Sequence, residues 1–116
     1  MPNKRLIGKK AEDIACSFLQ RNGLVLIERN YHCRYGEIDL IMQDTDTLVF
    51  VEVRYRKSAT FGSAIETVDS HKQRKIIFTA NHYLQKHPGN QPIRFDVVAL
   101  APQHEPDWII NAFMDS

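Results

Sequence analysis

The sequence has few cysteines and no long hydrophobic run. Its two cysteines, Cys16 and Cys33, have no CxxC spacing and are too few to cross-link a domain of this size, so we expect both to be reduced. The longest uninterrupted apolar run, residues 97–101, is far too short to cross a bilayer. The first residues, Met1-Pro2-Asn3-Lys4-Arg5, lead into a charged segment and not into the apolar core of a signal peptide. We therefore expect a cytoplasmic protein that does not enter a membrane.

An excess of charge of one sign is also missing. Lysine and arginine number 15 and aspartate and glutamate 14, which leaves a formal net charge of +1. Overall charge alone therefore does not identify a nucleic-acid-binding protein. The five histidines and two cysteines lack the spacing of zinc ligands, so no zinc site is predicted.

Basic residues do cluster locally, after the second strand of a predicted hairpin and at the start of a predicted helix. If these clusters lie beside a catalytic centre, we expect them to contact nucleic-acid phosphates, and binding would then weaken steeply with added salt. An ordinary solvent-exposed surface is the alternative for any one cluster. The candidate nucleic-acid-binding residues are Arg56, Lys57, Lys72, Arg74 and Lys75.

The 116 residues, 43% hydrophobic and 25% charged, predict one domain that spans residues 1–116. Apolar spacing predicts a helix over about residues 6–21 and a second one from about residue 70 to the His87-Pro88-Gly89 break, with Ser70 and Gln73 as its capping box. The order α-β-β-β-α-β-β predicts an α/β sandwich, in which a central mixed sheet is flanked by helices. Residues 56–68 have no regular pattern and are the best candidate for a mobile loop. The predicted strands are residues 24–27, 36–41, 48–54, 93–100 and 108–113.

The second and third of these strands form a predicted hairpin with acidic residues inside apolar segments. With Asp44-Thr45-Asp46-Thr47 as the turn, the register places Asp39 opposite Glu52 on the same face, with Cβ atoms about 5 Å apart. Carboxylates that face each other are unfavourable unless a cation compensates them, and divalent cations prefer oxygen ligands. A three-residue loop would instead send the two side chains to opposite faces. Compensation by nearby arginine or lysine is the alternative to a metal ion.

The same register places Glu37 opposite Arg54, which predicts a cross-strand ion pair as one role for this arginine. Glu12 lies at the border of the apolar stripe of the first helix, one turn after Gly8, and from the residues alone it looks like a surface acid. For Lys72, a place at the start of a helix is as good an explanation as a contact with substrate.

Several motifs resemble the YraN-like family of small bacterial proteins regarded as endonucleases. That family is similar in fold to the restriction-endonuclease and archaeal Holliday-junction-resolvase superfamily. The resemblance implies a restriction-endonuclease-like three-layer sandwich with a PD-(D/E)xK-type site. Its most specific part is the GEIDLI segment followed by FVEVR. The matching segments are residues 8–15, Arg29-Asn30-Tyr31, residues 36–41 and 49–56, Phe61-Gly62 and Lys72-Gln73-Arg74.

The resemblance implies that Asp39, Glu52 and the main-chain carbonyl of Val53 bind one Mg²⁺ or Mn²⁺ ion, and that Glu12 is the additional acid of resolvase-type members. Arg54 stands where the superfamily more often has lysine. Because arginine stays protonated, Arg54 would stabilise charge on the scissile phosphate and would not act as a base.

Activation of water must then come from the metal ion or from another group such as Lys72. We therefore predict a metal-dependent endonuclease that hydrolyses phosphodiester bonds in DNA, with branched or structured DNA suggested by the resolvase similarity alone. A homodimer would suit an enzyme that cuts junctions. A nucleic-acid-binding or adaptor protein of the same fold with little or no turnover is the second interpretation, and a protein-interaction module is the third.

Overall fold

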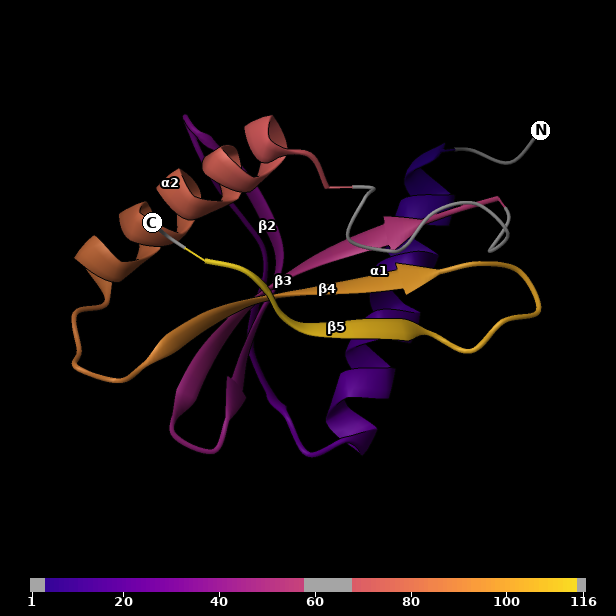
Figure 1. Ribbon diagram of the computed structural model, residues 1–116, viewed down its shortest axis with the longest axis horizontal. Helices are drawn as coiled ribbons and strands as arrows, with labels where there is room; N and C mark the ends of the chain where they lie inside the picture. Colours follow the sequence, from indigo (N-terminus) through magenta and orange to yellow (C-terminus); the bar gives the residue numbers. More distant parts are fainter. Residues whose placement is uncertain (1–3, 58–67, 115–116) are drawn as a thin grey trace.

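The computed structural model describes residues 4–57 and 68–114 (Figure 1). The predicted order of elements is confirmed, although β1 extends well beyond the predicted strand. Most of the segment predicted to be a mobile loop, and the Phe61-Gly62 motif, lie outside the described residues. The elements are α1 (Lys4–Arg21), β1 (Val25–Cys33), β2 (Gly36–Asp44), β3 (Thr47–Tyr55), α2 (Ser70–Lys86), β4 (Ile93–Leu100) and β5 (Asp107–Phe113).

The five strands form one mixed sheet in the order β1-β2-β3-β4-β5. Only β3 and β4 pair in parallel, and the segment between these two strands contains α2. A parallel pair needs such a crossover, because its strands start at the same edge of the sheet. Helix α1 packs on one face, mainly against β3, and α2 packs on the other, mainly against β2 (Figure 1). The predicted three-layer α/β sandwich is confirmed.

Two hydrophobic cores lie on the two faces of the sheet. On the α1 side, Ala15 and Leu19 pack with strand residues that include Val49. On the α2 side, Ile76 and Tyr83 belong to the other cluster. Strand β3 contributes to both cores, which is why its sequence is a continuous apolar run and not an alternating one.

The helix ends show one confirmed prediction and one wrong one. Helix α1 ends before Gly23, whose φ of 95° favours glycine. The N-cap of α2 is Asp69 and not Ser70: a carboxylate oxygen of Asp69 accepts a hydrogen bond from the backbone N–H of Lys72 at 2.8 Å. Asp69 has the extended backbone that an N-cap requires, whereas Ser70 is already helical.

The two cysteines are free thiols, as predicted: Cys16 is buried and Cys33 is half-buried. The Cys33 Sγ atom accepts a hydrogen bond from the backbone N–H of Tyr35 at 3.4 Å. In the described part of the chain, neither helix is long and apolar enough to cross a membrane.

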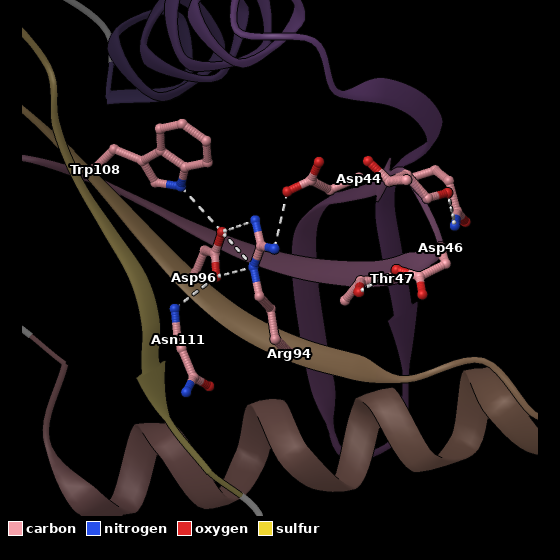
Figure 2. A network of polar contacts seen from close by, with 9 residues as sticks. Asp44, Asp46, Thr47, Arg94, Asp96, Trp108 and Asn111 are labelled. Carbon is pink, nitrogen blue, oxygen red and sulfur yellow. Dashed lines mark hydrogen bonds and ion pairs between the residues drawn. The ribbon is translucent and has the colours of Figure 1, made fainter.

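A polar network fastens β5 to β4 around Asp96, whose exposed fraction is 0% (Figure 2). The Asp96 carboxylate accepts hydrogen bonds from the guanidinium of Arg94 at 3.0–3.2 Å, from Trp108 Nε1 at 3.0 Å and from the backbone N–H of Asn111 at 2.9 Å. Arg94 also contacts Asp44 at 2.9 Å, beside the β2–β3 turn. The network therefore joins three strands, and each oxygen of the buried carboxylate has partners.

Candidate metal centre

The hairpin of β2 and β3 has the predicted register. Asp44 pairs with Thr47 around a two-residue turn, and the ladder continues to Leu40 opposite Val51. The next two positions are those of Asp39 and Glu52. Beyond them β2 runs toward α2, and β3 continues beside β4 (Figure 1). We call this divergence of β2 and β3 the fork, and the candidate site lies there.

Where the backbone ladder of β2 and β3 ends, the side chain of Asp39 provides the next hydrogen-bond acceptor for β3. One of its carboxylate oxygens accepts a hydrogen bond from the backbone N–H of Val53 at 2.8 Å. The N–H groups of Leu48 and Arg56 donate to the β4 side of the strand, so alternation turns Val53 toward β2. Because the N–H and C=O of one strand residue point the same way, the Val53 carbonyl also faces the fork, where a metal ligand was predicted.

Burial and an excess of negative over positive charge around Asp39 raise the pKa of its carboxyl group. Burial, the charge of Glu52 and a hydrogen bond with the Glu52 side chain raise the pKa of Asp39 from its ordinary 3.8 to about 8. The N–H of Val53 and the charge of Lys72 act in the opposite direction. The predicted juxtaposition of Asp39 and Glu52 is therefore confirmed.

Three carboxylates gather at the fork. Glu12 of α1 and Glu37 and Asp39 of β2 each place a carboxylate oxygen within 4.8 Å of the other two. Burial, followed by the charge of Asp39, raises the pKa of Glu12, whereas hydrogen bonds from Asn30 and Arg29 lower it. A cluster of carboxylate oxygens is the donor set that hard divalent cations prefer. The acidic cluster of Glu12, Glu37 and Asp39 therefore fits a divalent metal ion.

Glu52 lies next to this acidic cluster but is compensated differently. It is 5% exposed, and its Oε2 atom lies 3.2 Å from the Arg54 guanidinium and 3.7 Å from Lys72 Nζ. The ion pair of Arg54 with Glu52 replaces the predicted one with Glu37, which was wrong. Its cause is the fork: β2 has left β3 before Glu37 is reached, so the ladder no longer holds Glu37 opposite Arg54.

The predicted basic residues lie in different surroundings. Lys72, in the first turn of α2, reaches the site through Glu52, while Arg74 and Lys75 are exposed on the same helix. Lys57 is exposed just after β3. The Arg56 guanidinium lies 2.9 Å from Asp107, and its side chain is only 10% exposed, so it holds the end of β3 to β5.

A cleft of about 790 Å³ opens beside the acidic cluster. Arg29 lines this cleft, and its guanidinium contacts Asp13 of α1 at 2.8 Å and Glu12 at 3.5 Å, which helps to fix the position of Glu12. Sequence reasoning assigned no role to Arg29 or to Glu37 as a ligand. The sequence signal that could have identified them is their place in matching motifs: Arg29 in Arg29-Asn30-Tyr31 and Glu37 in the GEIDLI segment. The cleft is lined by Gly8, Lys9, Glu12, Arg29, Asn30, His32 and Glu37.

Comparison with known proteins places this arrangement in a family. The sequence pattern described as "Uncharacterised protein family UPF0102" matches residues 11–100. The chain belongs to this family. A UPF0102 protein of Nitrosococcus oceani is 50% identical over 111 residues, covering 91% of this chain and 90% of the relative. Another, of Alcanivorax borkumensis, is 47% identical over 117 residues, covering 96% of this chain and 94% of the relative.

The matched range of the UPF0102 family includes every residue of the fork. It begins at Ala11, directly before Glu12, and extends through Asp39 and Glu52 to the end of β4. The resemblance to the YraN-like family is confirmed at the level of this family.

Proposed function

We propose that this UPF0102 protein is a metal-dependent endonuclease with a restriction-endonuclease-like site, which hydrolyses phosphodiester bonds in DNA. The observation that supports this most is the acidic cluster: three carboxylates within 4.8 Å, beside a fourth that is flanked by two cations. Glu12, Glu37 and Asp39 would hold Mg²⁺ or Mn²⁺, with Glu52 and the Val53 carbonyl adjacent. When bound, the ion supplies Lewis-acid polarisation of the phosphate and makes water easier to deprotonate.

The two cations beside Glu52, Arg54 and Lys72, have different roles in the proposed reaction. Arg54 stays protonated and neutralises negative charge that develops on the phosphate. Lys72 has a compact ammonium with three rotatable N–H donors on a flexible stem, so we assign to it the positioning of the attacking water. Lys72 thus takes, from α2, the role that the lysine of the superfamily pattern has on the strand. Arg74 and Lys75 on the same helix would hold flanking phosphates.

Cleavage assays test the proposal with a matched pair of variants on β2. Linear duplex, single-stranded and four-way DNA are incubated with Mg²⁺, Mn²⁺ or EDTA. We expect cleavage that EDTA abolishes, a loss of at least about 100-fold in Asp39→Asn, and wild-type activity in Asp44→Asn, whose carboxylate lies outside the acidic cluster. No cleavage by the wild-type protein on any substrate would contradict the proposal.

A second pair of variants tests the assignment of Lys72. Lys72→Arg keeps the positive charge but replaces the compact, rotatable ammonium donor with a rigid planar guanidinium. We expect Lys72→Arg and Lys72→Met to lose activity alike while they still bind Mn²⁺. Full activity of Lys72→Arg would assign Lys72 to electrostatic stabilisation only.

A nucleic-acid-binding or adaptor protein without turnover is the second candidate function. The observation that favours it is that Arg54 and Lys72 already compensate Glu52. Binding that weakens with salt, without cleavage in Mn²⁺, is the result that would distinguish it.

A further inference from the structure

The start of β2 carries an aromatic surface that the proposed chemistry does not use. Tyr35, in the β1–β2 turn, is 39% exposed, and Phe78 on α2 is 53% exposed. Their ring centroids are 5.8 Å apart, and the ring of His82 lies 6.4 Å from Tyr35. Two large rings thus remain in contact with solvent although they already touch each other.

A cation and amide groups surround these rings. The Arg34 guanidinium lies 4.9 Å from the centroid of the Tyr35 ring and donates a hydrogen bond to its hydroxyl at 2.8 Å. The rings border a hollow of about 190 Å³, which we call the aromatic hollow. Its lining residues are Arg34, Tyr35, Phe78, Asn81, His82 and Gln85.

The aromatic hollow connects to the fork along α2. Lys72, Lys75, Phe78 and His82 follow one another at spacings of three, three and four residues, so they form one stripe of the helix. With a rise of 1.5 Å per residue, Phe78 lies about 9 Å and His82 about 15 Å along the helix axis from Lys72.

Strand β2 packs closely on that stripe. A Cβ atom on Gly36 would meet the Thr79 hydroxyl at 3.4 Å and the Lys75 Cβ at 3.8 Å. One face of α2 therefore carries Lys72 at the fork, then Lys75, and then the exposed ring of Phe78.

We propose that the aromatic hollow binds an unpaired base of the DNA strand whose phosphate lies at the fork. This inference rests on the proposed nuclease function and names its substrate class: DNA with a single-stranded segment beside the cleavage point. Aromatic side chains stack on bases of any sequence, Arg34 matches the negative backbone, and the amides of Asn81 and Gln85 can hydrogen-bond to a base edge. An apolar protein partner would not require this cation and these amides.

Fluorescence measurements with 2-aminopurine test the proposal in EDTA, which prevents cleavage. The probe base is placed in a single-stranded oligonucleotide and, for comparison, inside a blunt duplex. We expect the wild-type protein to quench the single-stranded probe by stacking. Tyr35→Ala/Phe78→Ala should weaken binding of the single strand by about tenfold or more and leave duplex binding within about twofold.

Two controls separate stacking from loss of packing. Phe78→Leu keeps an apolar side chain without an aromatic face and should lose the quenching, whereas Phe78→Tyr should retain it. Ile110→Ala removes an exposed side chain of 52% exposure from β5, at the opposite edge of the sheet, and should bind as wild type. Thermal unfolding of each variant verifies that it is folded.

The outcomes distinguish the two proposals. If the wild-type protein neither binds nor cleaves DNA, the proposed function and this inference both fail. If it cleaves duplex DNA in a metal-dependent way and the double variant binds single strands as the wild type does, the aromatic hollow is not a base-binding site and the nuclease proposal stands.

Discussion

Two aspartates on strands of the same sheet have opposite surroundings. Asp96 on β4 is fully buried, and its oxygens accept hydrogen bonds from an arginine, an indole and a backbone N–H (Figure 2). Asp39 on β2 accepts one backbone hydrogen bond and lies near the carboxylates of Glu12, Glu37 and Glu52, whose charge outweighs that of Lys72.

The Asp96 carboxylate therefore stabilises the fold, whereas the carboxylates around Asp39 destabilise it when no cation is bound. In the folded protein, the hydrogen bonds that Asp96 accepts offset the free-energy cost of burying its charge. The few donors at the acidic cluster do not offset its excess negative charge, since the pKa of Asp39 and that of Glu12 are both raised, so a bound cation would remove a cost that the protein alone leaves in place. The comparison predicts opposite responses to the same kind of substitution.

The largest effect is expected for Asp96→Asn. It places an amide nitrogen where a buried oxygen accepts hydrogen bonds, and it removes one of the two carboxylates that pair with Arg94, so the free energy of unfolding should fall by about 3 kcal/mol or more. Asp44→Asn is the matched control, because Asp44 contacts the same guanidinium at the edge of the network and should cost less than about 1 kcal/mol. Urea denaturation measures both. Equal losses in the two variants would show that burial of Asp96 does not matter.

Metal binding should give the next largest effect, and in the opposite direction. Mn²⁺ at 100 times its dissociation constant should raise the free energy of unfolding by about 2.7 kcal/mol. Glu37→Gln removes one exposed carboxylate of the acidic cluster and should weaken the affinity by on the order of tenfold, whereas Asp44→Asn should leave it unchanged. Calorimetric titration measures the affinities, and an unchanged affinity in Glu37→Gln would exclude Glu37 as a ligand.

The smallest effect is a dependence of stability on pH in the absence of metal. The pKa of Asp39 is raised from 3.8 to about 8, so between these values the folded protein holds a proton that the unfolded chain has released. The contribution is fully present below about pH 4 and is lost as the pH rises to about 8, by on the order of 2 kcal/mol after solvent screening. Urea denaturation in EDTA should show this fall in the wild type and a flatter profile in Asp39→Asn. A wild-type stability that rises over the same range would contradict it.

Local patterns predicted the fold and the place of Asp39 beside Glu52 in the candidate site. The two-residue turn sets the register of the hairpin, so the closeness of Asp39 to Glu52 followed from counting alone. Helical spacing gave the end of α1 for the same reason, because it depends on neighbours in sequence.

The remaining contacts of the candidate site depend on how elements that are far apart in the sequence pack together. The register predicted a Glu37–Arg54 pair because it assumed a ladder that continues, and the fork ends that ladder. The contacts of Lys72 with Glu52 and of Arg29 with Glu12 join elements that no local pattern relates. Pattern analysis named Ser70 as the cap and did not consider Asp69; both residue types are good N-caps, and only the backbone conformation decides between them.

The fork draws its groups from α1, β2, β3 and α2, which lie up to sixty residues apart in the chain. A nascent polypeptide that has released only its first hairpin has the acids of β2 and β3 but neither helix α2 nor its lysine. If the protein cuts DNA, hydrolytic competence would therefore arrive only after α2 has been synthesised. A product truncated before α2 would lack Lys72 and, on the proposed mechanism, would not cut DNA.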